Sequence, residues 1–205
     1  MELLLSKTAK YVSRLLNDNL TEDYHYHNLQ HTKEVVKAAG EIGENAGFSA
    51  EQLEVLLLAA WFHDTGIVFD YFNHEDKSIE ICNEFLSKEN YPKDKIETVA
   101  SIINATKMPH NPVSFFHEVI CDADIAHMGR EDFAEKSELL RKEWESINGR
   151  EYSDHDWLQI NIDFLVENPF YTEYAKKYWS RNKENNLKNF QERMRRLYNN
   201  ENRTI

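Results

Sequence analysis

Four short segments of the chain carry the histidine and carboxylate side chains that could do chemistry. They are Tyr26–His31, Trp61–Gly66, Asn73–Glu75 and Cys121–Ile125. Imidazole together with carboxylate oxygens suits zinc, manganese, iron or nickel. A His-rich site that is completed by oxygen ligands and keeps open positions is typical of hydrolytic rather than structural metal centres.

His63 and Asp64 stand out because they follow the most apolar segment of the chain, Val55–Phe62. An imidazole and a carboxylate at the end of a core helix need partners or cost several kcal/mol, and a divalent cation would satisfy both. The other His-Asp pair, His155-Asp156, lies at a polar helix start, where aspartate favours the helix dipole. We therefore assign no function to the second pair.

Two further segments contribute candidates. Asp122 and Asp124 lie among apolar residues, so one of them is expected to point inward, and the other to lie behind it or on the surface. His27 and His31 are four residues apart, which predicts that both project from one helix face. Together the segments predict a metal centre assembled from several elements.

The elements that must position these residues are helical almost throughout. Apolar spacing predicts nine helices, or eight if two are continuous, and the Ser49/Gln52 pair predicts a capping box. The ranges are about 4–16, 27–42, 50–63, 74–88, 92–106, 115–127, 131–147, 154–167 and 170–198, the last with a break near Ser180. We expect an all-α multi-helix bundle that forms one domain over 1–205, with a motif-bearing core at about 24–130 and a helical extension at about 131–205.

Composition narrows the class of protein. The net charge of −12 disfavours nucleic acid and anionic membrane as partners. The longest apolar run, Val55–Phe62, is too short to span a bilayer. Cys82 and Cys121 lie in apolar helical patterns, as expected of reduced core thiols in a cytoplasmic protein.

The ordered set His31, His63-Asp64 and Asp124 resembles the HD superfamily of metal-dependent phosphohydrolases, over roughly 24–130. The form Tyr-His-Asn-x-x-His, here 26–31, is similar to the opening motif of a bacterial group of predicted HD phosphohydrolases. That group also has Ala-Trp-Phe-His-Asp, Asn-x-Glu-x-x-Ser and Ala-Thr-Lys…His segments. They correspond here to 60–64, 73–78, and 105–107 with His110.

The resemblance implies a bundle of the HD-domain type and a role for each matching residue. The metal ligands would be His31, His63, Asp64 and Asp124, with Asp64 also the ligand best placed to hold the attacking water. His27 would protonate the leaving oxygen and Lys107 would neutralise a phosphate oxygen. His74 and His110 would complete a second metal site or contact substrate.

The implied function is hydrolysis of a phosphate ester, of a nucleotide or another small phosphorylated metabolite, by metal-activated water. The implied cofactor is a divalent ion, one of Mn, Zn, Mg, Fe, Ni or Co. The chain departs from two relatives, because it lacks the Gly-Tyr-Pro motif of the cyclic-di-GMP hydrolases and carries Ile67 where the eukaryotic cyclic-nucleotide enzymes have a second histidine.

Two other readings stay open. The first is a sensory module that binds a metal or nucleotide without turnover, and the second is an all-α interaction domain without metal. Residues 176–205 hold nine basic and three acidic side chains. Docking of a partner protein on this basic segment is therefore a further alternative. Aromatic residues between 144 and 179 suit either a core or an interface, which leaves a homodimer open as well.

Overall fold

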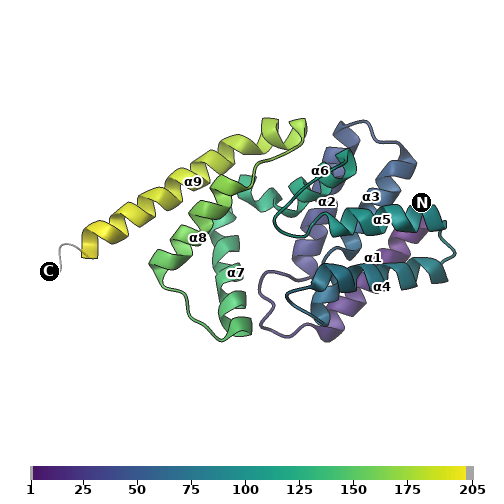
Figure 1. Ribbon diagram of the computed structural model, residues 1–205, viewed down its shortest axis with the longest axis horizontal. Coiled ribbons are helices and arrows are strands. Elements are labelled where there is room, and N and C mark those ends of the chain that lie inside the picture. Colours follow the sequence, from purple (N-terminus) through teal and green to yellow (C-terminus); the bar gives the residue numbers. More distant parts are fainter. Residues whose placement is uncertain (1, 202–205) are drawn as a thin grey trace. The chain divides into compact units, whose positions relative to one another are not determined.

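The computed structural model describes residues 2–201 and shows an all-α chain over that range, as the sequence predicts (Figure 1). Nine α-helices and two short 3₁₀ helices form the described part, and no strand occurs in it. The elements are α1 (Glu2–Asn19), α2 (Leu29–Asn45), α3 (Ala50–Phe62), η1 (Thr65–Val68), α4 (His74–Lys88), α5 (Lys93–Asn104), α6 (Phe115–Asp124), η2 (Ala126–Gly129), α7 (Phe133–Asn148), α8 (Asp154–Glu167) and α9 (Glu173–Glu201).

The chain forms two compact units, Met1–Ile125 and Ala126–Ile205. The first contains α1 to α6 with η1, and the second contains η2 with α7 to α9. All four candidate metal ligands belong to the first unit. The expectation of one domain over 1–205 stays a prediction.

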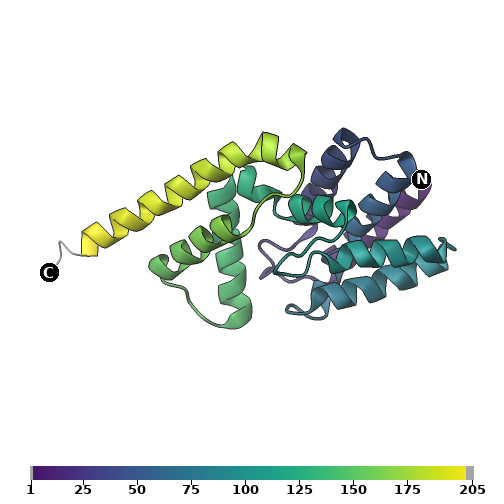
Figure 2. The same ribbon diagram turned by 45° about the horizontal axis from the view of Figure 1, so that its top comes forward.

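Helix α3 is the centre of the first unit. Its residues Val55, Leu56, Leu58, Ala59, Ala60 and Phe62 are buried, which is the pattern of a helix that is covered on every side. Helices α1, α2 and α5 pack against it, and α4 runs beside α5, as Figure 1 and Figure 2 both show. The C-terminal end of α3 therefore delivers His63 and Asp64 into the interior.

Side-chain caps fix the starts of α2 and α3. Ser49 and Gln52 form the expected capping box at the start of α3. The Asn28 side chain accepts hydrogen bonds from the backbone N–H groups of Gln30 and His31, with extended backbone at Asn28. This cap starts α2 at Leu29, so the expectation that His27 lies on the same helix as His31 is wrong.

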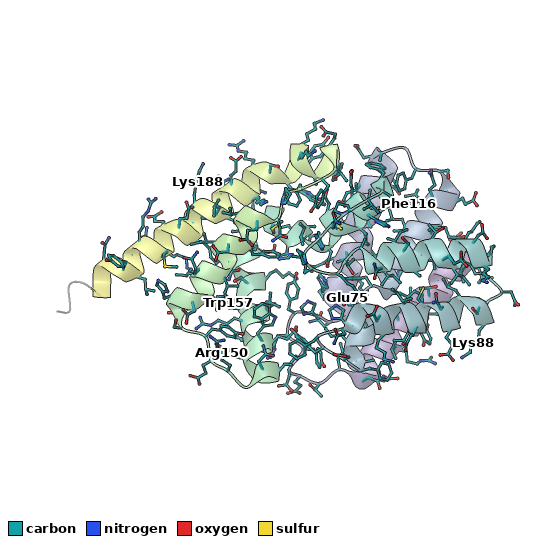
Figure 3. The ribbon with its side chains drawn as sticks, viewed as in Figure 1. Glu75, Lys88, Phe116, Arg150, Trp157 and Lys188 are labelled. Atoms are coloured by element: carbon teal, nitrogen blue, oxygen red, sulfur yellow. The ribbon has the colours of Figure 1, made fainter. Side chains whose placement is uncertain are left out.

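The second unit is held by aromatic and amide contacts. The Phe133 and Phe190 rings lie 5.2 Å apart, and the indole N–H of the buried Trp157 (Figure 3) donates to the Ser137 hydroxyl at 2.9 Å. The Asn186 amide donates to the carbonyl oxygens of Met128 and Arg130 at 3.0 and 2.8 Å, which anchors the middle of α9.

Two expected boundaries differ from the structure. Helix α9 continues through Ser180 without the expected break, because contacts such as those of Asn186 hold its polar middle in place. The helix that begins at Phe115 ends at Asp124 rather than His127, and η2 follows after Ile125. The end at Asp124 matters for function, because it places this carboxylate at a helix terminus.

Two other expectations concern the whole chain. Cys82 and Cys121 are both buried free thiols, as predicted. Among the described helices, none combines the length and the apolar character that crossing a bilayer requires.

Candidate metal centre

Three elements bring His31, His63, Asp64 and Asp124 together. His31 comes from the first turn of α2, His63 and Asp64 follow α3, and Asp124 ends α6. His31 Nε2 lies 3.3 Å from Asp64 Oδ2 and 3.3 Å from Asp124 Oδ1. His63 Nε2 lies 3.1 and 3.6 Å from the same two oxygens and 3.4 Å from His31 Nε2.

The donor atoms of this cluster have the orientation that a cation requires. His63 Nδ1 lies 2.8 Å from the Ala60 carbonyl oxygen, which can only accept, so Nδ1 carries a hydrogen and Nε2 is the ring nitrogen that faces the cluster. Asp64 Oδ2 is buried and accepts no hydrogen bond from any described residue. A buried carboxylate oxygen without a donor is costly, and a bound cation would remove that cost.

The spacing also fits. Two ligand atoms at about 2.1 Å from one ion are about 3.0 Å apart at a right angle and about 3.4 Å apart at the tetrahedral angle. The five measured separations run from 3.1 to 3.6 Å. The donor atoms of His31, His63 and Asp124, which all lie within 4.8 Å of one another, therefore fit a single divalent ion. Asp64 Oδ2 lies within 3.3 Å of both histidine nitrogens.

The four side chains strongly influence one another's pKa. Burial lowers the pKa of an imidazole and raises that of a carboxyl group. The opposite charges outweigh burial here: Asp64 and Asp124 raise the pKa of His63 well above its usual value, and that of His31 rises too. The histidines in turn hold the pKa of both carboxyl groups well below the usual range. A divalent cation would replace these imidazolium protons as the counter-charge of the carboxylates.

His74 approaches the cluster from α4. Its Nδ1–H donates to the Tyr71 carbonyl oxygen at 2.9 Å, and its Nε2 lies 3.3 Å from Asp64 Oδ1. Asp64 thus faces His31 and His63 with one oxygen and His74 with the other. Glu75 at the start of α4 (Figure 3) lies 3.6 Å from the same His74 nitrogen and is largely buried.

His110 lies on the other side of the cluster. Its Nε2 is 4.0 Å from Asp124 Oδ2, and only 1% of its side chain is exposed. Burial lowers the pKa of His110, so its imidazole is neutral at physiological pH. Both carboxylates therefore direct one oxygen to the His31–His63 pair and the other toward a further imidazole. This arrangement suits a second cation or the oxygens of a phosphate.

The position of α4 depends on Gly66. Its backbone N–H donates to the Ser78 hydroxyl at 2.8 Å. A Cβ atom at position 66 would lie 2.0 Å from the His74 carbonyl oxygen and 2.6 Å from Ser78 N. This explains the serine of the Asn-x-Glu-x-x-Ser segment: Ser78 holds α4 against η1, and this packing fixes the position of His74 at the start of α4.

His27 lies at the edge of the cluster, directly before the Asn28 cap. Its ring centroid is 4.8 Å from that of the buried Tyr26, 5.7 Å from that of His31 and 6.3 Å from that of His74. It is half-buried. The structure therefore brings His27 to the cluster, although from a loop rather than a helix.

Lys107 is the candidate that the structure does not bring to the cluster. Its Nζ pairs with Asp76 Oδ1 at 2.6 Å, and no ion pair within residues 2–201 joins it to the four candidate ligands. Asp122 is fully buried, which excludes a surface position. His155 and Asp156, the second His-Asp pair, are exposed, as expected of a polar helix start.

Sequence reasoning gave no role to Glu75 and Tyr26, although both stand in the segments it singled out, and it did not consider Tyr71. Glu75 stands inside a motif that was recognised, and its apolar-facing position in α4 is the signal that could have found it. Tyr26 and Tyr71 flank candidate histidines, but aromatic neighbours carry no specific signal by themselves.

Known proteins resemble this chain in sequence and in fold. Residues 28–129 match the sequence model of the HD domain. A crystal structure of a Lactobacillus plantarum protein has 15% identity and a TM-score of 0.71, and the match covers 97% of this chain and 98% of that one. The structure of a predicted HD superfamily hydrolase from an uncultured Thermotogales bacterium has 16% identity and a TM-score of 0.56, with 92% of each chain covered. No match was found among curated proteins. At such identities the two structures show a shared fold.

Proposed function

The chain belongs to the HD domain family through residues 28–129, and on that premise we propose that it is a metal-dependent phosphohydrolase. Its substrate would be a phosphate ester of a nucleotide or of another small phosphorylated metabolite. One observation carries the proposal: the Nε2 atoms of His31 and His63 lie 3.4 Å apart, and each lies 3.1 to 3.6 Å from one carboxylate oxygen of Asp64 and one of Asp124.

These four residues would hold a divalent ion, one of Mn, Zn, Mg, Fe, Ni or Co. Such an ion, when bound, polarises a phosphoryl oxygen and lowers the pKa of water. The protein's contribution is to fix the ligands. The Ala60 carbonyl orients His63, and the Asn28 cap holds the first turn of α2, from which His31 projects.

His27 would act as the general acid. Its ring contacts those of His31 and His74, so it lies at the edge of the cluster, where it would face the leaving group. An imidazole at this place would be within reach to donate a proton to the leaving oxygen. Asp64 would hold the attacking water, because one of its oxygens faces His31 and the other faces His74.

His74 and His110 would bind a second cation or the phosphate itself. Each lies beside the outer oxygen of one carboxylate, so a phosphate bound between them would span the cluster. Lys107 would have to leave Asp76 to reach such a phosphate, which ranks its contribution below that of the histidines.

The test combines metal analysis with turnover. Purified protein, prepared without chelators, is analysed for metals and assayed on nucleotides and simple phosphate esters with each of the six ions. We expect His63→Ala and Asp64→Ala to lose bound metal and hydrolysis together. His155→Ala is the matched control, because it alters the exposed His-Asp pair, and it should change neither.

Two results would overturn the proposal. One is hydrolysis by His63→Ala and Asp64→Ala at the wild-type rate. The other is tight nucleotide binding without hydrolysis under every ion, which would favour a sensory module.

A further inference from the structure

The loop between η1 and α4 exposes two large aromatic rings beside the metal centre. Phe69 is 67% exposed and Phe72 is 72% exposed, although both lie within ten residues of the buried Asp64. An exposed phenyl ring offers a flat apolar face that a ligand can contact. The two rings differ in how they are connected to the site.

Phe72 is held in place by its own loop. The Asp70 carboxylate accepts hydrogen bonds from the backbone N–H groups of Phe72 at 2.9 Å and Asn73 at 3.2 Å, and from the Asn73 amide at 3.3 Å. The Tyr24 hydroxyl donates to the Ile67 carbonyl oxygen at 3.3 Å, which braces the start of the loop. The exposed ring therefore sits on a fixed backbone, and little conformational entropy would be lost when a ligand contacts it.

Phe72 also lies at the outer end of a row of rings that begins at the metal centre. Its centroid is 5.5 Å from that of Tyr71, in an edge-to-face contact, and Tyr71 is 6.0 Å from His27 in the same kind of contact. The Tyr71 carbonyl oxygen accepts the His74 Nδ1–H at 2.9 Å. Tyr71 thus contacts the proposed general acid His27, the candidate phosphate ligand His74 and the exposed ring of Phe72. No ring contact connects Phe69 to this row among the described residues.

We propose that Phe72 binds the planar ring of the substrate, so that the preferred substrates are phosphate esters whose alcohol half carries an aromatic ring, as in a nucleotide. The inference rests on the proposed function, since it requires the phosphate to bind at the histidine cluster. His27 lies between the cluster and Tyr71, as expected if the scissile oxygen is next to His27 and the ring lies further out. A phenyl face offers no hydrogen bonds, so selection should be for a ring and not for one particular base.

The experiment measures binding without turnover. The probes are methylenephosphonate analogues of the four common nucleoside monophosphates and of ribose 5-phosphate, whose P–C bond resists hydrolysis. Affinities for the metal-loaded protein are measured by titration calorimetry. Stacking of one base on an aromatic side chain predicts that at least one nucleoside analogue binds about 5-fold to 150-fold more tightly than the ribose analogue.

Three variants sharpen the result. Phe72→Ala should bring the ratio of nucleoside to ribose affinity close to one, and Phe72→Tyr should keep it. Phe69→Ala is the matched control from the same loop and should leave the ratio unchanged. The proposal is overturned if no nucleoside analogue binds better than the ribose analogue, if the preference survives Phe72→Ala, or if Phe69→Ala abolishes it equally.

This outcome is separable from that of the proposed function. A protein that hydrolyses phosphate esters but shows no ring preference refutes only the role of Phe72. A protein that binds nucleoside analogues through Phe72 but cleaves no ester with any ion refutes only the enzymatic assignment.

Discussion

Replacing Gly66 by alanine should damage the candidate site from a position that touches no ligand atom of the cluster. The added Cβ would lie 2.0 Å from the His74 carbonyl oxygen, 2.6 Å from Lys77 Cβ and 2.6 Å from Ser78 N. Ordinary contact begins near 3.4 Å, so η1 and the start of α4 must separate by about 1.4 Å. Two of the three atoms belong to the backbone, so no rotamer change can relieve the clash.

The cost can be worked from two contributions. Overpacking of this kind costs about 1–3 kcal/mol. Separation of the two elements also breaks the buried hydrogen bond from Gly66 N–H to Ser78, which is worth about 1 kcal/mol. We therefore expect Gly66→Ala to lower the free energy of unfolding by about 2–4 kcal/mol. A shift of this size at His74, which lies 3.3 Å from Asp64, should also reduce hydrolysis by about 100-fold.

Gly40→Ala supplies the matched control. Gly40 lies within α2, and its added Cβ would have Leu57 Cδ2 at 3.7 Å as its nearest neighbour, which is an ordinary contact. Alanine in a helix interior is favoured over glycine by about 1 kcal/mol, so this variant should be more stable than the parent. Urea denaturation followed by circular dichroism gives both values. A Gly66→Ala protein as stable as the parent, or a Gly40→Ala protein equally destabilised, would refute the close-packing argument.

Three further predictions concern single contacts. Burial lowers the pKa of His74, but its hydrogen bond with Asp64 outweighs burial and raises the pKa to about 9. The His74–Asp64 pair should therefore stabilise the metal-free protein fully at a pH below about 6.5, and this stabilisation should be lost as the pH rises through about 9. In EDTA, His74→Gln should reduce the slope of unfolding free energy against pH in that window by about 1.4 kcal/mol per unit, and an unchanged slope would contradict the pairing. Asn28→Ala should lower the unfolding free energy by about 1–2 kcal/mol in urea, because it removes the cap of α2 and the amide hydrogen bonds to the carbonyl oxygens of Tyr24 and His25. Asn28→Asp keeps the cap but loses the amide bonds, so its loss should be smaller. Ser78→Ala should cost about 1–3 kcal/mol in the same assay, because the Gly66 N–H is then left buried without an acceptor.

Apolar periodicity was sufficient to predict the helices, because most of them bury one continuous stripe. It was less informative where polar contacts decide the outcome. The sequence Ser180–Asn186 is polar enough to suggest a break, yet α9 continues because Asn186 binds two carbonyl oxygens of the η2 region, more than fifty residues away. A contact at such a separation has no local signal.

The candidate ligands were predictable for a different reason. A histidine and an aspartate that end an apolar helix must face the interior, and burial of His63 and Asp64 follows from that alone. Their approach to His31 and Asp124 needed the resemblance, because spacing along the chain does not fix which helices meet. Lys107 shows the limit of carrying residues over from a motif, since its pairing with Asp76 across 31 residues depends on where α4 lies.

The segment from Asp64 to Ser78 connects most of these features. It begins with the candidate metal ligand Asp64, turns at Gly66, exposes Phe72 on a loop fixed by Asp70 and then enters α4 at His74. Ligand geometry, the orientation of His74 and the position of the exposed ring thus depend on the same close approach of Gly66 to α4. A substitution that loosens this approach should therefore weaken metal binding and ring preference together, whereas Phe72→Ala should remove the ring preference alone.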